Sequence, residues 1–174
     1  IIDSKTGTSG GGRSAKEHLL LSECSESIVP YGVIGHRHTY EIEEVATDIA
    51  GHKIEIQFTP HLVPMVRGIL STSYGRLRDP GLTAEDCTTV LKAFYKGKPC
   101  IKVLPVGIYP STKWVKGTNK ALLSVQVDKR NGRLVIICVI DNLIKGQAGQ
   151  AIQNLNIMHG LKEDIGLPKI TFYP

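Results

Sequence analysis

The sequence has few cysteines and no long apolar segment, and both absences limit the classes of protein to which the chain can belong. Its four cysteines, Cys24, Cys87, Cys100 and Cys138, lie far apart, with no Cys-x-x-Cys spacing. This pattern favours free thiols in a reducing compartment over a disulfide framework. The longest apolar run, Leu134–Ile140, is far too short to cross a bilayer, and no signal-peptide pattern opens the chain. We therefore expect no membrane partner and a cytoplasmic location.

Basic tracts and nucleotide-binding glycine motifs are missing as well. The formal net charge is +5, but the Lys and Arg residues are scattered among acids, which is typical of a mildly basic surface. We expect no nucleic-acid partner. The chain contains neither a G-x-G-x-x-G fingerprint nor a P-loop. With 174 residues, of which 41% are hydrophobic and 21% charged, it has the composition of one ordinary globular domain.

Hydrophobic periodicity predicts a mixture of strands and helices. We expect strands near residues 53–59, 66–77, 122–127 and 133–140, and helices near residues 39–50, 83–96 and 145–159. Asn131-Gly132 supplies turn residues for a hairpin between the last two strands, and the run after it is apolar on both faces, as in a central strand. The predicted fold class is α+β, with a mixed, largely antiparallel sheet and helices packed on one face.

The densest cluster of chemically active side chains is His36-Arg37-His38, directly before the helix predicted at 39–50. The positive end of a helix dipole favours anions and lowers the pKa of an imidazole. A lone loop histidine is most often a solvated or capping residue. Two histidines flanking an arginine favour acid–base chemistry on an anionic substrate instead. Because no nearby Cys or His completes a third ligand, we predict no metal site.

Two further segments have both a structural and a functional interpretation. The glycine-rich loop around Gly7–Gly12 allows close approach of a ligand to the backbone, although a flexible connector is the commoner explanation. Asn142 follows the last predicted strand and precedes a helix, where a capping role is the simpler interpretation. Arg13 is either a surface charge or an anion contact.

Four ordered segments carry a family resemblance: residues 6–13 (TGTSGGGR), 35–42 (GHRHTYEI), 58–70 (FTPHLVPMVRGIL) and 141–151 (DNLIKGQAGQA). Together they resemble the C-terminal part of N-acetyl-gamma-glutamyl-phosphate reductase, an arginine-biosynthesis family of the semialdehyde dehydrogenase superfamily. The resemblance runs over nearly all of the chain. It implies NADPH-dependent reduction of N-acetylglutamyl 5-phosphate, a small acyl phosphate, to the 5-semialdehyde.

The resemblance also implies roles for individual residues. Ser9, Gly10 and Gly11 would lie against the nicotinamide end of NADP, and Asn142 would contact the nicotinamide carboxamide. His36 or His38 would move protons at the nucleophilic sulfur, with His36 as first choice because it lies further from the helix start. Arg37 would bind the phosphate or carboxylate of the substrate.

The expected domain organisation follows from a family segment that this sequence lacks. The segment Gly-Cys-Tyr-Pro-Thr, which carries the nucleophilic cysteine of the family, does not occur. We therefore expect residues 1–174 to be a single C-terminal catalytic and dimerisation domain, with the nucleotide-binding domain and nucleophile upstream. Residues 141–174 would pack against that missing domain. Alone, the chain would be inactive.

The expected assembly is a homo-oligomer, a dimer or a tetramer, because an isolated sheet would expose apolar surface. Two other functions remain open. One is a reductase acting on a related carrier-linked acyl phosphate, as in a lysine-type pathway. The other is a non-catalytic assembly module, because the nucleophile and the nucleotide-binding fold are both absent from the sequence.

Overall fold

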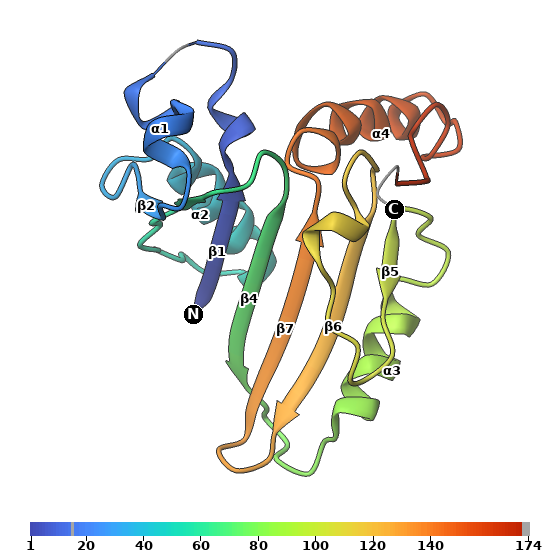
Figure 1. Ribbon diagram of the computed structural model, residues 1–174. Helices are drawn as coiled ribbons and strands as arrows, with labels where there is room; N and C mark the ends of the chain where they lie inside the picture. The colour runs from blue at the N-terminus through green and yellow to red at the C-terminus, as the bar shows by residue number, and fades with distance from the viewer. Residues whose placement is uncertain (15, 172–174) are drawn as a thin grey trace.

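The computed structural model describes residues 1–14 and 16–171 and contains one sheet of seven strands, ordered β2-β3-β1-β4-β7-β6-β5 (Figure 1). The strands are β1 (Ile2–Gly7), β2 (Val29–Pro30), β3 (His61–Val63), β4 (Ile69–Arg76), β5 (Ile101–Val103), β6 (Ala121–Asp128) and β7 (Arg133–Ile140).

The centre of the sheet is antiparallel, since β7 pairs along its whole length with β4 on one side and with β6 on the other. The pairs β1–β4 and β2–β3 are also antiparallel, whereas β1–β3 and β5–β6 are parallel. The predicted mixed, largely antiparallel sheet is confirmed. The apolar run of β7 lies at the centre of the sheet, where Val139 is buried and the other residues after Arg133 are half-buried.

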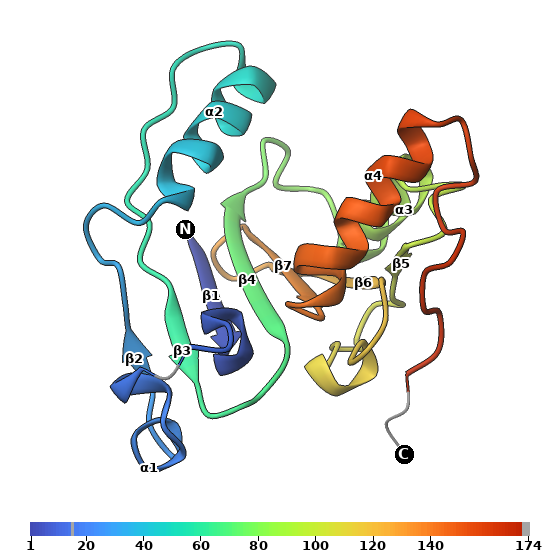
Figure 2. The ribbon, with the colours of Figure 1, turned by 90° about the horizontal axis from the view of Figure 1, so that it is seen from above.

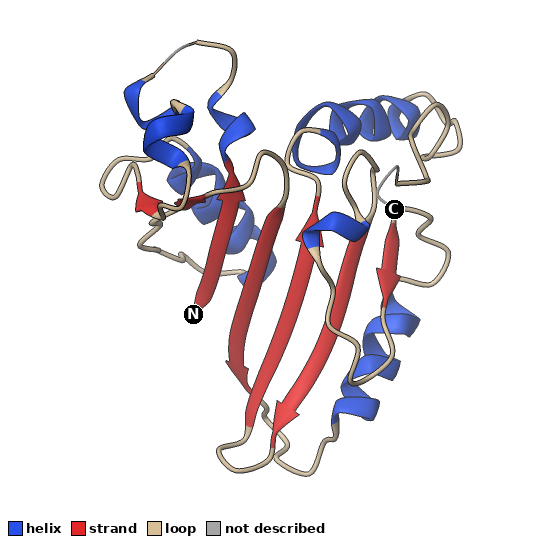
Figure 3. Cartoon of the chain, in the orientation of Figure 1, coloured by secondary structure: helices blue, strands red, loops and turns tan. Residues whose placement is uncertain are grey.

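The helices are α1 (Leu21–Cys24), α2 (His38–Ala50), α3 (Ala84–Phe94) and α4 (Gly149–Met158), with 3₁₀ turns at Thr8–Gly11, Glu17–Leu19 and Thr112–Trp114 and a π turn at Ile144–Ala148. Viewed along the strands, α2, α3 and α4 lie on the same side of the sheet (Figure 2). Figure 3 distinguishes the helices from the strands in a view of the face of the sheet. The helix of α3 begins with a capping box, in which Thr83 and Asp86 bond each other's backbone N–H groups.

Each face of the central strands has its own apolar layer. On one face, Leu122 and Val139 pack with Leu104 and Val115, and Leu70 completes the cluster. Side chains alternate across a strand, so Val125 and Ile136 point to the opposite face, beneath α3.

One predicted strand is wrong. Residues 53–59 pair with no other strand, and the neighbouring strand β3 begins only at His61. The reason lies in the backbone donors of this segment. The N–H of Ile54 donates to Thr47 Oγ1 at 2.9 Å and the N–H of Ile56 donates to Glu43 Oε1 at 2.9 Å, so side chains of α2 take the place of a neighbouring strand. The alternation of apolar residues there reflects packing along a helix.

The segment after α4 returns along the same domain. Leu167 is buried, and the N–H of Asn119 donates to the carbonyl of Pro168 at 3.0 Å. The predicted contact of residues 141–174 with another domain stays a prediction, and residues 172–174 lie outside the described range. In the described part of the chain, every helix is too short or too polar to cross a membrane.

Candidate active site

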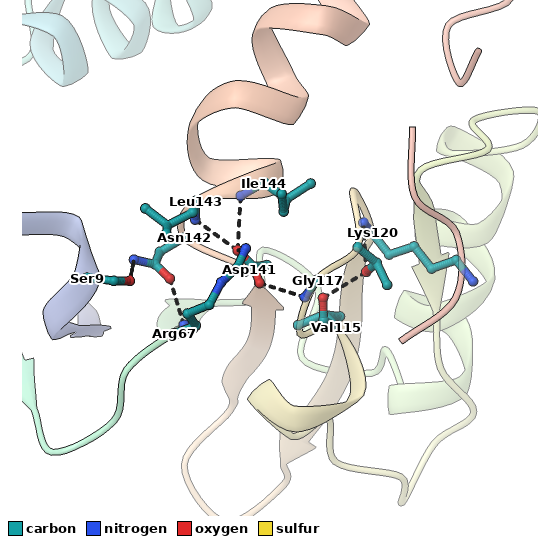
Figure 4. Close-up of polar contacts among 11 residues, drawn as sticks. Ser9, Arg67, Val115, Gly117, Lys120, Asp141, Asn142, Leu143 and Ile144 are labelled. Atoms are coloured by element: carbon teal, nitrogen blue, oxygen red, sulfur yellow. Dashed lines mark hydrogen bonds and ion pairs between the residues drawn. The ribbon is translucent and has the colours of Figure 1, made fainter. Parts of the chain in front are cut away.

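Three segments far apart in the sequence meet at the upper end of the sheet: the 3₁₀ turn after β1, the loop before β4 and the end of β7 (Figure 4). The side chain of Asn142 joins all three. Its Oδ1 accepts from the N–H of Gly68 at 2.8 Å, and its Nδ2 donates to Ser9 Oγ at 3.0 Å. Asn142 is only 7% exposed. A buried amide that is hydrogen-bonded at both its oxygen and its nitrogen is held in one orientation.

Directly before Asn142, the fully buried carboxylate of Asp141 organises the same region. Its Oδ1 accepts from Arg67 Nη2 at 2.8 Å, and its Oδ2 accepts from the N–H of Gly117 at 2.7 Å. The N–H groups of Leu143 and Ile144 both donate to Oδ1 at 2.9 Å. Burial alone would raise the pKa of the Asp141 carboxyl, but these donors outweigh burial and hold that pKa below its ordinary value.

The chain leaves Asn142 through a π turn at Ile144–Ala148. Its N–H groups reach back five residues, Gly146 to the carbonyl of Asp141 at 2.9 Å and Ala148 to that of Leu143 at 3.0 Å. A π turn is rare and occurs mostly at functional sites. The helix after it packs closely against Asn119, so that a Cβ added to Gly149 would lie only 2.3 Å from Asn119 Oδ1. This explains why a glycine stands inside a helix.

Three of the four predicted cofactor residues therefore lie together. Ser9 bonds Asn142, and a Cβ added to Gly10 would lie 3.6 Å from Asn142 Nδ2, an ordinary contact. Gly11 belongs to the same turn but has a different constraint. A Cβ there would lie 2.4 Å from Leu19 Cδ1, so a larger residue at this position would displace the Leu19 side chain.

His36 and His38 form a second cluster at the start of α2. The N–H of His38 donates to His36 Nδ1 at 3.1 Å, and the N–H of Thr39 donates to the carbonyl of His36 at 3.0 Å. The His36 side chain therefore accepts the first backbone N–H of α2, while the N-cap position itself is Arg37. The His36 ring is half-buried and contacts Tyr31 and Phe58 edge-to-face, with centroids 5.5 and 5.1 Å away.

The electrostatics of this cluster favour a neutral His36. Burial lowers the pKa of its imidazole, and the neighbouring His38 and Arg37 lower it further. Because Nδ1 accepts an amide hydrogen, the neutral ring carries its proton on Nε2. His38 and Arg37 are exposed. The ring of His38 lies 4.8 Å from that of His36, centroid to centroid.

The residues that sequence reasoning missed are Arg67 and Asp141. The signal for Asp141 was its place between a buried strand and a helix start, where the sequence analysis considered only Asn142 as a cap. Arg67 gave no local signal, because its partner is 74 residues away. Within residues 1–14 and 16–171, no three His, Cys, Asp or Glu side chains gather as a metal site requires.

Comparison with known proteins shows the family to which the chain belongs. Residues 1–142 match the family described as semialdehyde dehydrogenase, dimerisation domain. The chain belongs to this family. Curated proteins named N-acetyl-gamma-glutamyl-phosphate reductase align with all of it: two from strains of Prochlorococcus marinus are 75% and 76% identical, and one from a Nostoc species is 60% identical. The resemblance predicted from the four sequence segments is confirmed.

The chain spans about half the length of these curated relatives, 48% of the Prochlorococcus proteins and 49% of the Nostoc protein. Among solved structures, aspartate semialdehyde dehydrogenase II of Vibrio cholerae superposes with a TM-score of 0.65 over 90% of this chain and 54% of that one, at 18% identity. A probable aspartate-semialdehyde dehydrogenase of Pseudomonas aeruginosa superposes with a TM-score of 0.64 over 92% of this chain and 55% of that one, at 14% identity. These two similarities establish the fold alone.

Proposed function

We propose that this chain is the dimerisation-domain part of an N-acetyl-gamma-glutamyl-phosphate reductase, which reduces N-acetylglutamyl 5-phosphate to the 5-semialdehyde in arginine biosynthesis. The observation that carries the proposal is identity of 60% to 76% with curated reductases over all 174 residues. The hydrogen-bonded pair of Ser9 and Asn142 also supports the proposal, because a hydroxyl group beside an amide group can bind the amide of a ligand.

The cofactor of the proposed reaction is NADPH, which supplies a hydride when bound. A nicotinamide carboxamide offers one carbonyl and one NH₂ group, and a serine hydroxyl beside an asparagine amide can satisfy both. Asn142 and Ser9 would hold this carboxamide. Gly10 would let the ring approach, because its missing side chain leaves the backbone uncovered beside Asn142 Nδ2. Gly11 would shape the turn without touching the ligand.

Proton transfer falls to the histidine pair. A general base needs a free lone pair, and His36 Nδ1 already accepts the N–H of His38. His38 is exposed and is therefore the better proton acceptor for a nucleophilic thiol. His36, which carries its proton on Nε2, would orient the helix start and donate a hydrogen bond. This reverses the order predicted from the sequence. Exposed Arg37 would bind the phosphate or carboxylate of the substrate as a permanently charged, planar donor.

The proposed assembly is a homodimer, in which a second copy covers apolar surface of this domain. An apolar groove of about 190 Å³ lies between α3 and the sheet, lined by Val90, Val125 and Ile136 among others. Beside it Phe94 is 73% exposed and Val90 is 65% exposed. Exposed apolar surface of this kind marks an interface. Light scattering at micromolar concentration should give twice the mass of one chain, and a monomer would contradict the proposed dimer.

The test of the function is a coupled assay on the complete polypeptide that contains this segment. NADPH oxidation should depend on N-acetylglutamyl phosphate and should be at least tenfold slower with aspartyl phosphate or a carrier-linked acyl phosphate. Faster reduction of the carrier-linked substrate would overturn the substrate assignment. No oxidation with any of the three would overturn the reductase proposal and favour an assembly module.

A further inference from the structure

The loop between β3 and β4, residues 64–68, holds the backbone of the turn that carries Ser9. Three of its carbonyl groups accept consecutive N–H groups of that turn: Gly68 from Gly7 at 2.8 Å, Met65 from Thr8 at 2.9 Å and Val66 from Ser9 at 3.1 Å. The two segments also touch, because a Cβ added to Gly7 would lie 2.8 Å from the carbonyl oxygen of Val66. The position of Ser9 therefore depends on the position of this loop.

The side chain of Arg67, in the middle of the loop, fixes the loop to the segment after β7. Arg67 Nη2 donates to Asp141 Oδ1 at 2.8 Å, and the N–H of Gly68 donates to Asn142 Oδ1 at 2.8 Å (Figure 4). The Asp141 side chain is fully buried and that of Arg67 is 26% exposed. Such a pair is screened by salt and solvent much less than a surface pair, so it can hold the loop in place.

We propose that Arg67 is a positioning residue, which holds Ser9 beside Asn142 through the backbone of its own loop. The contacts run from the Asp141 carboxylate to the Arg67 guanidinium, along the loop to the carbonyl of Val66, and from there to the N–H of Ser9. Asp141 and Asn142 are adjacent in the chain, so these contacts set how far Ser9 lies from Asn142. That the pair of Ser9 and Asn142 binds the cofactor rests on the proposed function.

The other contacts of the loop are weaker than this ion pair. On the side of the 3₁₀ turn at Thr112–Trp114, a Cβ added to Gly68 would lie 2.8 Å from Thr112 Cβ, and Thr112 Oγ1 donates to Met65 Sδ at 3.8 Å. A thioether sulfur is a weak acceptor. Arg67 is the only charged residue in the loop. Its removal should therefore loosen the loop and the turn that the loop holds.

Removal of Arg67 should leave the rest of the domain folded. The Asp141 carboxylate keeps three backbone N–H donors without it, those of Gly117, Leu143 and Ile144. Arg67→Met replaces the charged side chain by an unbranched apolar one. Arg67→Lys keeps the charge but loses the planar fork of donors, so it should restore part of the effect. The matched control is Arg78→Met, because Arg78 is exposed beyond the far end of β4.

The first measurement is amide hydrogen exchange in the complete polypeptide that contains this segment. The N–H groups of Thr8 and Ser9 should exchange about tenfold faster in Arg67→Met than in the unmodified protein, because the loop that holds them opens more often. Arg67→Lys should lie between the two, and Arg78→Met should match the unmodified protein. Unchanged exchange at Thr8 and Ser9 in Arg67→Met would overturn the proposal, whatever the activity of the enzyme.

The second measurement is steady-state kinetics with NADPH. Arg67→Met should raise the KM for NADPH by about tenfold, as Asn142→Ala should, and keep kcat within about threefold. A merely structural role would lower the folded fraction, and so kcat, without changing KM. If Asn142→Ala raised KM and Arg67→Met did not, the role of Arg67 would be wrong and the cofactor assignment would stand. If neither variant raised KM, the cofactor assignment would be wrong, and the role of Arg67 in it as well.

Discussion

The two parts of the candidate active site differ in how they are held. The joint formed by the hydrogen-bonded residues Asp141 and Asn142 is buried, and its most distant partners lie 74 residues away (Arg67 and Gly68) and 133 residues away (Ser9) in the sequence. The histidine pair is held by neighbours within a few residues and by Phe58, and His38 is exposed. The joint is thus fixed by the fold of this domain. The histidine pair has an open side that a second surface, such as the nucleophile segment of the family, can cover.

The largest effect should come from the histidine pair. In the complete reductase, His38→Asn should lower kcat by about 10²–10⁴-fold, the usual span for a lost general base. His36→Asn is the matched control, because asparagine also accepts an N–H bond at a helix start and should keep turnover within about tenfold. The reverse ranking would restore His36 as the proton carrier. Near-normal turnover in both folded variants would rule out the acid–base role.

A substitution in the buried hydrogen-bond network of Asp141 should lower the free energy of unfolding of the domain. Asp141→Asn leaves the Arg67 guanidinium without its counter-charge and turns an NH₂ group towards a backbone donor, which should cost about 3 kcal/mol in the free energy of unfolding. Glu55→Gln also removes a carboxylate from an ion pair, but the pair is exposed and should make no measurable difference. Urea unfolding compares the two variants. Equal stabilities would show that the joint is not a structural centre.

A smaller effect separates binding from chemistry. Asn142→Ala should raise the KM for NADPH by about tenfold, the value of one lost hydrogen bond to a buried partner, with little change in kcat. Ser9→Ala should shift the same parameter less, because one partner remains. A loss confined to kcat would contradict the assignment of this joint to cofactor binding.

The smallest effect is the pH dependence that His36 contributes to stability. Its pKa lies below about 6.5 in the folded protein because of burial and nearby cations, so the unfolded chain binds the proton first as the pH falls. The stability that His36 contributes is present above about pH 6.5 and is lost as the pH falls towards its folded pKa. Urea unfolding at pH 7.5 and 5.0 should show a smaller difference in His36→Asn than in the unmodified chain. Identical differences would contradict this account.

The long apolar elements were predictable from the sequence, and the short ones were not. β4, β6, β7, α2 and α3 lie within a few residues of the expected ranges. β2 and β3 have only two and three residues, too few for a periodic pattern. The prediction of a strand at 53–59 was wrong because alternating apolar residues indicate only which side of an extended segment is buried. The alternation does not indicate which groups accept the backbone hydrogen bonds of the segment.

The site was predictable where the residue type itself carries the chemistry. The histidines were chosen because two imidazoles beside a guanidinium suit acid–base chemistry, whereas Ser9 and Asn142 were chosen from the family resemblance, and all of these roles stay predictions. Asp141 and Arg67 act by holding other groups, and their pairing depends on β4 and β7 lying side by side. The hydrogen bond of His36 at the helix start depends on the path of the chain at residues 35–37. Neither the pairing of Asp141 with Arg67 nor the hydrogen bond of His36 at the helix start can be predicted from the sequence before the fold is known.

The contrast between the two parts can be measured directly by amide hydrogen exchange on the 174-residue chain. The N–H groups of Gly68, Gly117 and Ile144 donate to the joint, so they should exchange far more slowly than an unfolded chain. The N–H groups of His38 and Thr39, at an exposed helix start, should exchange rapidly. Exchange of the joint amides as fast as that of the helix start would contradict the claim that this domain forms its cofactor joint by itself.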